Sequence, residues 1–297
     1  MNYTPKHPLC YMHLPKTGGT TVRTFVRHNF GDEVINSSIP NHVDERYPID
    51  PETKATIYLG HFDKRFWNNR SIKPHFVTVL RHPVDRAVSL YYFWRSRGHK
   101  HHEALEPFFL TPLISMRKTF REFVFSRNLG VGTYLCNSQA RQLVHGLHFV
   151  FEDSDEQLLR CAISELHSYR IVGELKKLDH FLRAVGTLFG KRDVTLPPKT
   201  NSNESMKLNF PASYVAKPKE IDPEIRIQLT RLNLVDLVLY EWAQSQWQDE
   251  QYVPSCSLDD DLNWAVSRLV ELQVEYGLHN ENSADYYDKK RYTEFFK

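Results

Sequence analysis

Short apolar runs alternate along this chain with stretches in which apolar residues recur at helical spacing. The runs are too short for helices and are rich in β-branched or aromatic residues, and they comprise Leu9 to Met12, Thr56 to Leu59, Phe76 to Leu80 and Arg170 to Val172. Apolar strands separated by helices are typical of a parallel sheet covered on both faces. The pattern therefore predicts an α/β fold, a three-layer α/β/α domain around a central parallel sheet.

The C-terminal part of the chain has a helical pattern. Apolar spacing predicts one long helix from Ile221 to Trp247, which packs back on the domain, and a second helix from Leu258 to Tyr276. The acidic residues at 259–261 suit the N-terminus of the second helix. We therefore expect a domain over residues 1–250 and a helical C-terminal extension over residues 251–297, with a role in packing on the domain or in contact with another copy of the chain.

The segment His13 to Thr21, with the sequence HLPKTGGTT, directly follows the first apolar run. Its two glycines let the backbone approach an anion, Lys16 adds a positive charge, and the helix predicted after it offers the positive end of its dipole. The pair Thr20 and Thr21 is expected to cap that helix. Two glycines alone are also typical of a tight turn, but together with the lysine and the helix they favour a loop that binds phosphate or sulfate.

Two strand-to-helix segments, the lysine loop and the segment after the strand His75 to Leu80, both differ from the corresponding parts of a triphosphatase. In the loop GxxxxGK[ST] the lysine follows the glycines, whereas Lys16 precedes them, and the strand His75 to Leu80 ends in Arg81 where a metal-binding carboxylate is expected. Ser89 is placed about one turn inside the next helix, from which it and Arg81 could share one anion. Two anion sites at neighbouring strand ends predict a ligand with phosphates at both ends.

The two segments HLPKTGGTT and LRHPVDRAVSLYYF together resemble the paired signatures of the 3′-phosphoadenylyl-sulfate-dependent sulfotransferases, above all the carbohydrate 2-O/6-O and bacterial family-2 branch. The resemblance extends over roughly Leu9 to Trp247 and implies a P-loop-like domain. It implies that the 3′-phosphate is held by Arg81 and Ser89. The 5′-phosphosulfate would be held by Lys16, Thr17, Gly18, Gly19, Thr20 and Thr21.

The polar loop after Pro197 and Pro198 matches the loop that covers the donor only loosely. Lys199 and Thr200 are candidate donor contacts in this loop, and a plain surface loop is the alternative.

Gly60-His61-Phe62 resembles the family element that carries the catalytic base. His61 also follows an apolar run, and ligands gather at such strand ends in open α/β sheets. A histidine with the ordinary pKa of about 6.5 is largely neutral yet basic near pH 7. We predict that His61 accepts the acceptor proton and that Lys16 stabilises the transferring sulfuryl group, in an in-line displacement that requires no metal. His13 is the rival base.

Other clusters keep open alternatives. Asn137, Gln139 and Arg141 resemble the family segment Asn-x-Gln-x-Arg-x-Leu and are expected either to form a structural network or to line the site. The segment from Arg95 to His102 is a solvated loop, an acceptor contact or a metal site. The aromatic run from Tyr91 to Trp94 either stacks on a sugar ring or belongs to the core.

Net charge, apolar runs and cysteine spacing limit the classes of protein to which the chain can belong. The chain has 38 basic and 36 acidic residues, a net charge of +2, which does not suggest the basic field of a nucleic-acid-binding protein. No run approaches the roughly 20 apolar residues of a membrane span, and a secretory signal is lacking, so a cytoplasmic protein is expected. The four cysteines lack paired spacing and are expected to be reduced thiols.

These features predict an O-sulfotransferase that uses 3′-phosphoadenylyl sulfate (PAPS) as donor and releases adenosine 3′,5′-bisphosphate (PAP). The expected acceptor is a hydroxyl of a carbohydrate, in a glycan or glycolipid. The alternative is a P-loop-type kinase or nucleotide-binding module that uses ATP and magnesium.

Overall fold

The computed structural model describes residues 4, 6–31, 35–36, 55–61, 67, 72–98, 117–146, 152–198, 220–278 and 282–287. The chain divides into two compact units, each assembled from three separate segments. The first unit comprises Met1–Arg81, Gln139–Pro198 and Val238–Ser267, and the second comprises His82–Ser138, Lys199–Leu237 and Arg268–Lys297. The expected boundary at residue 250 stays a prediction.

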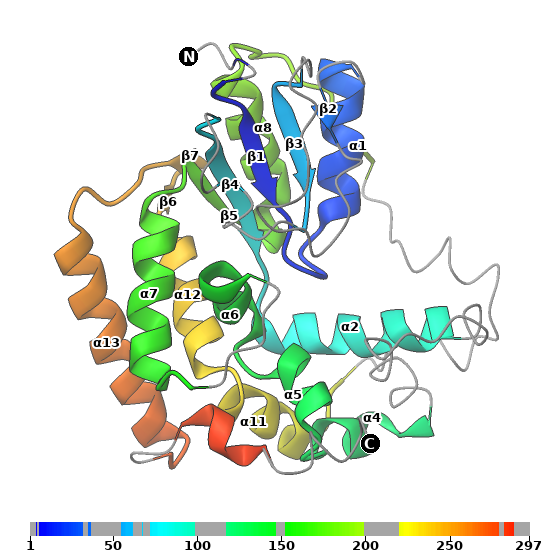
Figure 1. The fold of residues 1–297 in the computed structure, drawn as a ribbon, viewed down its shortest axis with the longest axis vertical. Helices are drawn as coiled ribbons and strands as arrows, with labels where there is room; N and C mark the ends of the chain where they lie inside the picture. Colours follow the sequence, from blue (N-terminus) through cyan, green and yellow to red (C-terminus); the bar gives the residue numbers. More distant parts are fainter. Residues whose placement is uncertain are drawn as a thin grey trace. The chain divides into compact units, whose positions relative to one another are not determined.

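The first unit contains the parallel sheet that the apolar runs predicted (Figure 1). Its strand order is β2-β3-β1-β4-β5, and all four neighbouring pairs are parallel. The strands are β1 (Leu9–Met12), β2 (Ile35–Asn36), β3 (Ile57–Gly60), β4 (His75–Leu80) and β5 (Ile171–Glu174). The four predicted runs agree with β1, β3, β4 and β5 to within two residues at each end.

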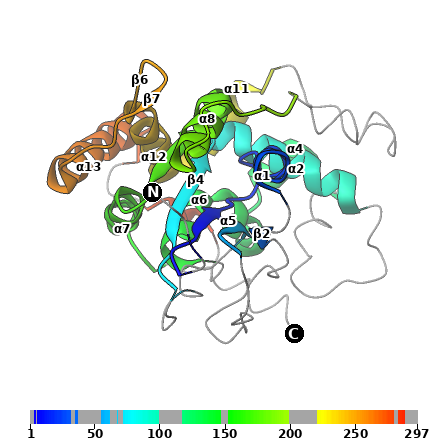
Figure 2. The ribbon, with the colours of Figure 1, turned by 90° about the horizontal axis from the view of Figure 1, so that it is seen from above.

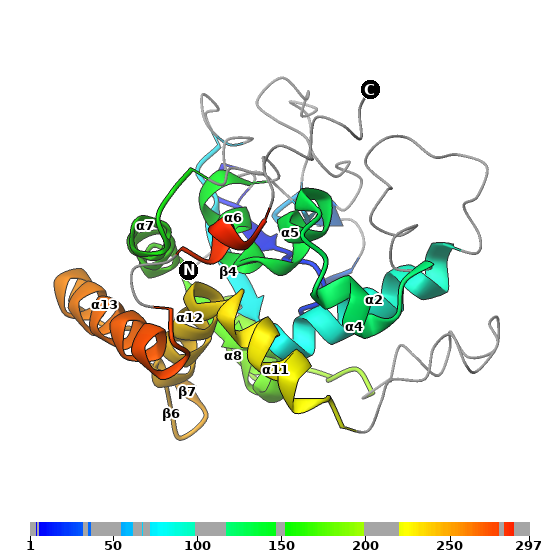
Figure 3. The ribbon, with the colours of Figure 1, turned by 90° about the horizontal axis from the view of Figure 1, so that it is seen from below.

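Helices cover both faces of this sheet, which confirms the three-layer arrangement. On one face α1 (Gly19–Phe30) and α8 (Leu178–Leu188) share a buried core with the strands, in which Phe25 and Phe181 are fully buried. On the other face lies α7 (Asp155–His167), and Tyr169, just after it, stacks on Phe76 of β4 (Figures 2 and 3). The strands are consequently buried on both sides, which explains their continuous apolar sequence.

The second unit is helical among its described residues. Its helices include α2 (Pro83–Gly98), α4 (Phe120–Val124), α5 (Leu129–Leu135) and α11 (Pro223–Arg231), and the 3₁₀ helix η4 spans Ser283–Tyr286. Their core includes Val84, Tyr91, Phe123 and Leu229. Tyr91 is therefore a core residue, and Tyr92 and Trp94 pack against the same core, so these three aromatic side chains support packing rather than an exposed stacking surface.

The single helix predicted from Ile221 to Trp247 is wrong, because the structure divides it into α11 and α12 (Leu234–Ser245). Asn137 occupies the break. Its backbone N–H donates to the carbonyl of Leu232 at 3.1 Å, and its Oδ1 accepts from the N–H of Val235 at 3.1 Å. Apolar spacing could not reveal this helix start, since its capping side chain comes from a distant part of the chain.

The helix predicted from Leu258 to Tyr276 is confirmed as α13 (Leu258–Glu275). A short hairpin of β6 (Trp247–Gln248) and β7 (Gln251–Tyr252) precedes it, and the Trp247 indole N–H donates to the carbonyl of Val172 in β5 at 2.9 Å. No helix in the described ranges is long and apolar enough to cross a membrane.

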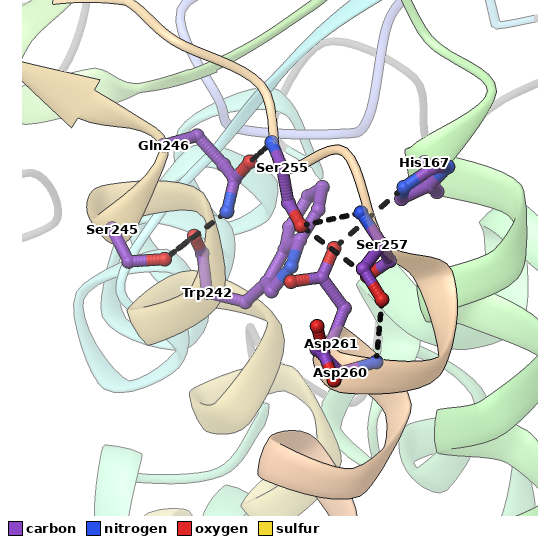
Figure 4. Close-up of polar contacts among 8 residues, drawn as sticks. All are labelled: His167, Trp242, Ser245, Gln246, Ser255, Ser257, Asp260 and Asp261. Atoms are coloured by element: carbon purple, nitrogen blue, oxygen red, sulfur yellow. Dashed lines mark hydrogen bonds and ion pairs between the residues drawn. The ribbon is translucent and has the colours of Figure 1, made fainter.

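Polar contacts hold the start of α13 within the first unit (Figure 4). The N–H of Ser255 donates to Oε1 of Gln246 at 2.7 Å, and the Ser257 hydroxyl accepts from the N–H of Asp260 at 3.2 Å. Nε2 of His167, at the end of α7, lies 3.9 Å from Oδ2 of Asp261. The start of α13 and the residues just before it are thus held by the last residue of α7 and by Gln246, which follows α12, in the same unit.

Packing of α13 predicts a measurable contrast between adjacent residues. Leu269 is 1% exposed and Val270 is 52% exposed. We expect Leu269→Ala to lower the free energy of unfolding by about 2 to 5 kcal/mol, because it removes buried methyl groups and leaves a cavity. The control Val270→Ala should change it by about 0.5 kcal/mol or less. Urea unfolding of both variants measures this, and equal effects would contradict an integral role for α13.

Candidate functional site

Three chain segments leave the sheet at the carboxyl ends of neighbouring strands, β3, β1 and β4 (Figure 1). His61 follows β3, the segment from His13 to Thr21 follows β1, and Arg81 follows β4. The register pairs Met12 with Gly60 and with Thr78, so these segments start at one edge of the sheet. The structure therefore brings together the predicted site residues of the first unit at the edge where α/β proteins bind ligands.

The other predicted site residues belong to the second unit or fall outside the described residues. Ser89 is in the second turn of α2, in the second unit, and is 7% exposed, so its pairing with Arg81 on one anion stays a prediction. Lys199, Thr200 and the histidine cluster at 99–102 lie outside the described residues.

The lysine loop enters α1 through two left-handed residues. Lys16 has φ 71°, and Gly18 has φ 95° and is the N-cap of α1, which begins at Gly19. The predicted capping role of Thr20 and Thr21 is wrong, because both lie in the first turn and no side chain caps this helix among the described residues. The first-turn amides thus lack a side-chain acceptor, and an anion at this position would satisfy them and interact with the helix dipole.

Both glycines of the loop are required by their surroundings. A Cβ atom on Gly18 would lie 2.6 Å from Cδ1 of Leu175, and a Cβ on Gly19 would lie 2.0 Å from Nε2 of His13. Gly18 also needs its positive φ, which L-residues with a Cβ adopt at a cost of roughly 1 kcal/mol. Thr17 is fully buried and donates its hydroxyl to the carbonyl of Leu14 at 2.8 Å. The loop is therefore held in one conformation by local packing.

Arg81 is held by Gln139 and in turn holds the lysine loop. Gln139 accepts from the N–H of Arg81 at 3.0 Å and donates to the carbonyl of Arg81 at 2.9 Å. Nη1 of Arg81 donates to the carbonyl of Lys16 at 3.1 Å. The Arg81 contact supports the unusual backbone of Lys16, because a strained residue persists only where its surroundings constrain it.

Two members of the Asn-x-Gln-x-Arg segment make structural contacts, and the third is buried. Asn137 caps α12, Gln139 holds Arg81, and Arg141 is 2% exposed at its position in α6 (Ser138–His145). Sequence reasoning identified the segment but missed the Gln139 contact. The two-residue spacing of the polar side chains marked the segment. It could not identify Arg81 as the partner of Gln139, because Arg81 lies 58 positions earlier in the sequence.

This division predicts different consequences for two matched substitutions. Asn137→Ala should cost about 0.5 to 2 kcal/mol of stability through loss of the α12 cap, with little effect on PAP binding. Gln139→Ala should cost a similar amount of stability, and it should also weaken PAP binding by about 3- to 10-fold, because it releases the backbone of Arg81. Thermal unfolding and calorimetry on both variants test this. Equal PAP affinities for the two variants would count against the coupling.

His61 stacks on His13 where β3 and β1 end. The ring centroids are 4.1 Å apart and the planes differ by 24°. Nδ1 of His61 lies 2.5 Å from the carbonyl oxygen of His13, and Nε2 of Gln142 lies 3.4 Å from the same oxygen. Burial lowers the pKa of His13 well below its ordinary value, and the nearby charges of His61, Arg23 and Lys16 lower it further. His13 is therefore a weak proton acceptor.

A buried carboxylate lies at the same sheet edge, at the end of β5. Glu174 is 2% exposed and accepts from the Tyr240 hydroxyl at 2.7 Å and from Nε2 of Gln244 at 2.8 Å, while Nζ of Lys177 lies 3.5 Å from its other oxygen. One of its oxygens is therefore engaged by α12 and the other by Lys177. Within the described part of the chain, no group of three or more His, Cys, Asp and Glu side chains could hold a metal ion.

The fold and these strand-end loops define an α/β protein with a glycine-rich loop between its first strand and first helix. A family model described as "Sulfotransferase family" matches residues 1–243. The chain therefore belongs to the sulfotransferase family, which confirms the resemblance found in its two signature segments. Among curated proteins, none matches the chain.

Proposed function

We propose that this sulfotransferase transfers the sulfuryl group of PAPS to a hydroxyl of a carbohydrate acceptor, with His61 as general base and Lys16 stabilising the group in transfer. One observation carries the proposal. Three neighbouring strands of a single compact unit are each followed by one element of the site. These elements are the lysine loop with its uncapped helix start, Arg81, which is hydrogen-bonded to that loop, and His61.

The loop residues have the properties that the donor's 5′ end requires. The backbone amides of Gly19, Thr20 and Thr21 in the first turn of α1 would hold the 5′-phosphate, and Lys16 would offset charge that grows on the bridging oxygen and the sulfuryl oxygens. Arg81 is placed one strand away, where its guanidinium would meet the 3′-phosphate. Thr17 is buried and its hydroxyl donates a hydrogen bond to the carbonyl of Leu14, so we assign Thr17 the role of maintaining the conformation of the loop.

The chemistry is a displacement at sulfur. The acceptor oxygen forms a bond to sulfur as the bond from sulfur to the bridging phosphate oxygen breaks, PAP leaves, and the acceptor proton moves to His61. The His13 carbonyl accepts a hydrogen bond from Nδ1 of His61, which places the hydrogen of the neutral imidazole on Nδ1 and the basic lone pair on Nε2. Positioning and charge stabilisation then supply most of the rate.

Two considerations support sulfotransfer over the kinase alternative. The chain belongs to the sulfotransferase family, and the acidic residue at the end of β5 is engaged by Tyr240, Gln244 and Lys177. The carbohydrate acceptor rests on the resemblance to the 2-O/6-O and bacterial family-2 branch alone.

Mass spectrometry of reaction mixtures tests the proposal. The protein is incubated with PAPS and a panel of glycans and glycolipids, with a chelator in one arm and with ATP and magnesium replacing PAPS in another. We expect PAP and a sulfated acceptor to form in the presence of the chelator. Phosphorylated acceptor in the ATP arm, with no product from PAPS, would overturn the proposal and support a kinase.

A further inference from the structure

The imidazole rings of His13 and His61 lie together at the ends of the parallel strands β1 and β3. Because Met12 is in register with Gly60, the next residues, His13 and His61, emerge side by side, and the N–H of His13 donates to the carbonyl of Gly60 at 2.9 Å. Their rings stack at 4.1 Å. The stack is thus fixed by the sheet register rather than by flexible side chains alone.

The ring of His13 lies between His61 and the lysine loop. Its other neighbours are Tyr11, whose ring centroid is 5.6 Å away at an interplanar angle of 20°, and Gly19, where a Cβ atom would collide with the imidazole. Gly19 is the first residue of α1. The imidazole of His13 therefore sets the separation between His61 and the helix start that would bind the donor.

The main chain of His13 contacts His61 as well. A carbonyl oxygen only accepts hydrogen bonds, so the 2.5 Å approach of Nδ1 of His61 requires the hydrogen on Nδ1. The same oxygen is approached by Nε2 of Gln142, which is 6% exposed on α6. One residue thus fixes both the tautomer and the ring plane of His61.

The charges around His13 suit a supporting role. Burial, followed by the charges of His61, Arg23 and Lys16, lowers its pKa well below 6.5. A neutral His13 leaves the proton exchange to His61 and adds no positive charge opposing protonation of the neighbouring ring.

We propose that His13 is a positioning residue for His61, its carbonyl oxygen selecting the Nδ1–H tautomer and its ring holding the His61 imidazole against the lysine loop. This rests on the proposed role of His61 as general base. The role differs from that of a second base, because the side-chain contribution of His13 is its flat ring and not its nitrogen atoms.

Two substitutions separate these roles. His13→Ala removes the ring, and we expect kcat to fall about 10- to 100-fold through misplacement of His61, with the Kd for PAP changed by less than about threefold. His13→Phe restores a flat ring without nitrogen atoms and should recover kcat to within about fivefold of the wild-type value. An inactive His13→Phe that binds PAP normally would overturn the proposal, as would an unaffected His13→Ala.

A spectroscopic measurement on the full chain is independent of turnover. Long-range ¹H–¹⁵N correlation spectra assign the tautomer of His61, and we expect Nδ1–H in the wild type and in His13→Phe. His13→Ala keeps the carbonyl oxygen but loses the ring that holds the His61 imidazole against it, so we expect a mixture of tautomers in that variant. An Nε2–H tautomer in the wild type would overturn the proposal. If the expected tautomers appear but PAPS is not turned over by the wild type, the positioning of His61 stands and the proposed sulfotransfer from PAPS fails.

Discussion

Replacing His61 with alanine is expected to lower kcat by about 10²- to 10⁴-fold, the usual effect of removing a general base. The proton of the acceptor hydroxyl would then have no positioned acceptor as the bond to sulfur forms. Binding of PAP should change by less than about threefold, since the proposed phosphate contacts come from the lysine loop and Arg81. Steady-state kinetics with PAPS and calorimetry with PAP measure the two effects.

His28 provides a matched control for this substitution. It is an exposed histidine in the last turn of α1, and His28→Ala should leave both kcat and PAP affinity unchanged. A His61→Ala variant with wild-type kcat would show that His61 is not the general base and would leave His13 as the candidate. The lowered pKa of His13 makes this residue a chemically unfavourable general base.

The Lys16→Ala substitution should lower kcat by about 10²- to 10³-fold, as expected when one preorganised charge-stabilising group is removed. Alanine is a clean replacement here, because Lys16 has φ 71° and alanine carries the same left-handed backbone cost as lysine. The contact between its carbonyl and Arg81 uses main-chain atoms and can persist. The measured loss therefore reports the ammonium group.

Lys73, an exposed lysine just before β4, is the control for charge alone. Lys73→Ala should retain the wild-type kcat and Kd. If Lys16→Ala weakened PAP binding strongly while kcat stayed unchanged, Lys16 would be a binding residue and not a group that stabilises the transfer.

The sequence predicted those parts of the fold that depend on local patterns. Strands buried on both faces leave continuous apolar runs, and a strand followed by two glycines and an amphipathic helix identifies the lysine loop. The positions of His61 and Arg81 at the ends of the two strands that flank β1 are consistent with the same reasoning, in which the runs ending at Leu59 and Leu80 were taken as parallel strands.

Features that depend on contacts between distant residues were not predictable. The stack of His13 on His61 requires the register of Met12 with Gly60, which neither strand encodes by itself. Asn137 ends one helix and starts another from a position 98 residues before Val235, and the apolar spacing continues across the break. The threonines after the glycines suggested a cap, but the positive φ of Gly18 lets the helix begin one residue before Thr20.

The most direct test of the donor site is calorimetric titration of PAP into the wild type and Arg81→Ala, with adenosine 5′-monophosphate and ATP plus magnesium as control ligands. We predict micromolar PAP binding by the wild type and a loss of about tenfold or more in the variant, since a charge-assisted hydrogen bond contributes about 1.5 to 3 kcal/mol. Adenosine 5′-monophosphate should bind more weakly than PAP because it lacks the 3′-phosphate. A preference for ATP with magnesium, unaffected by Arg81→Ala, would contradict a PAPS site at the ends of β1 and β4.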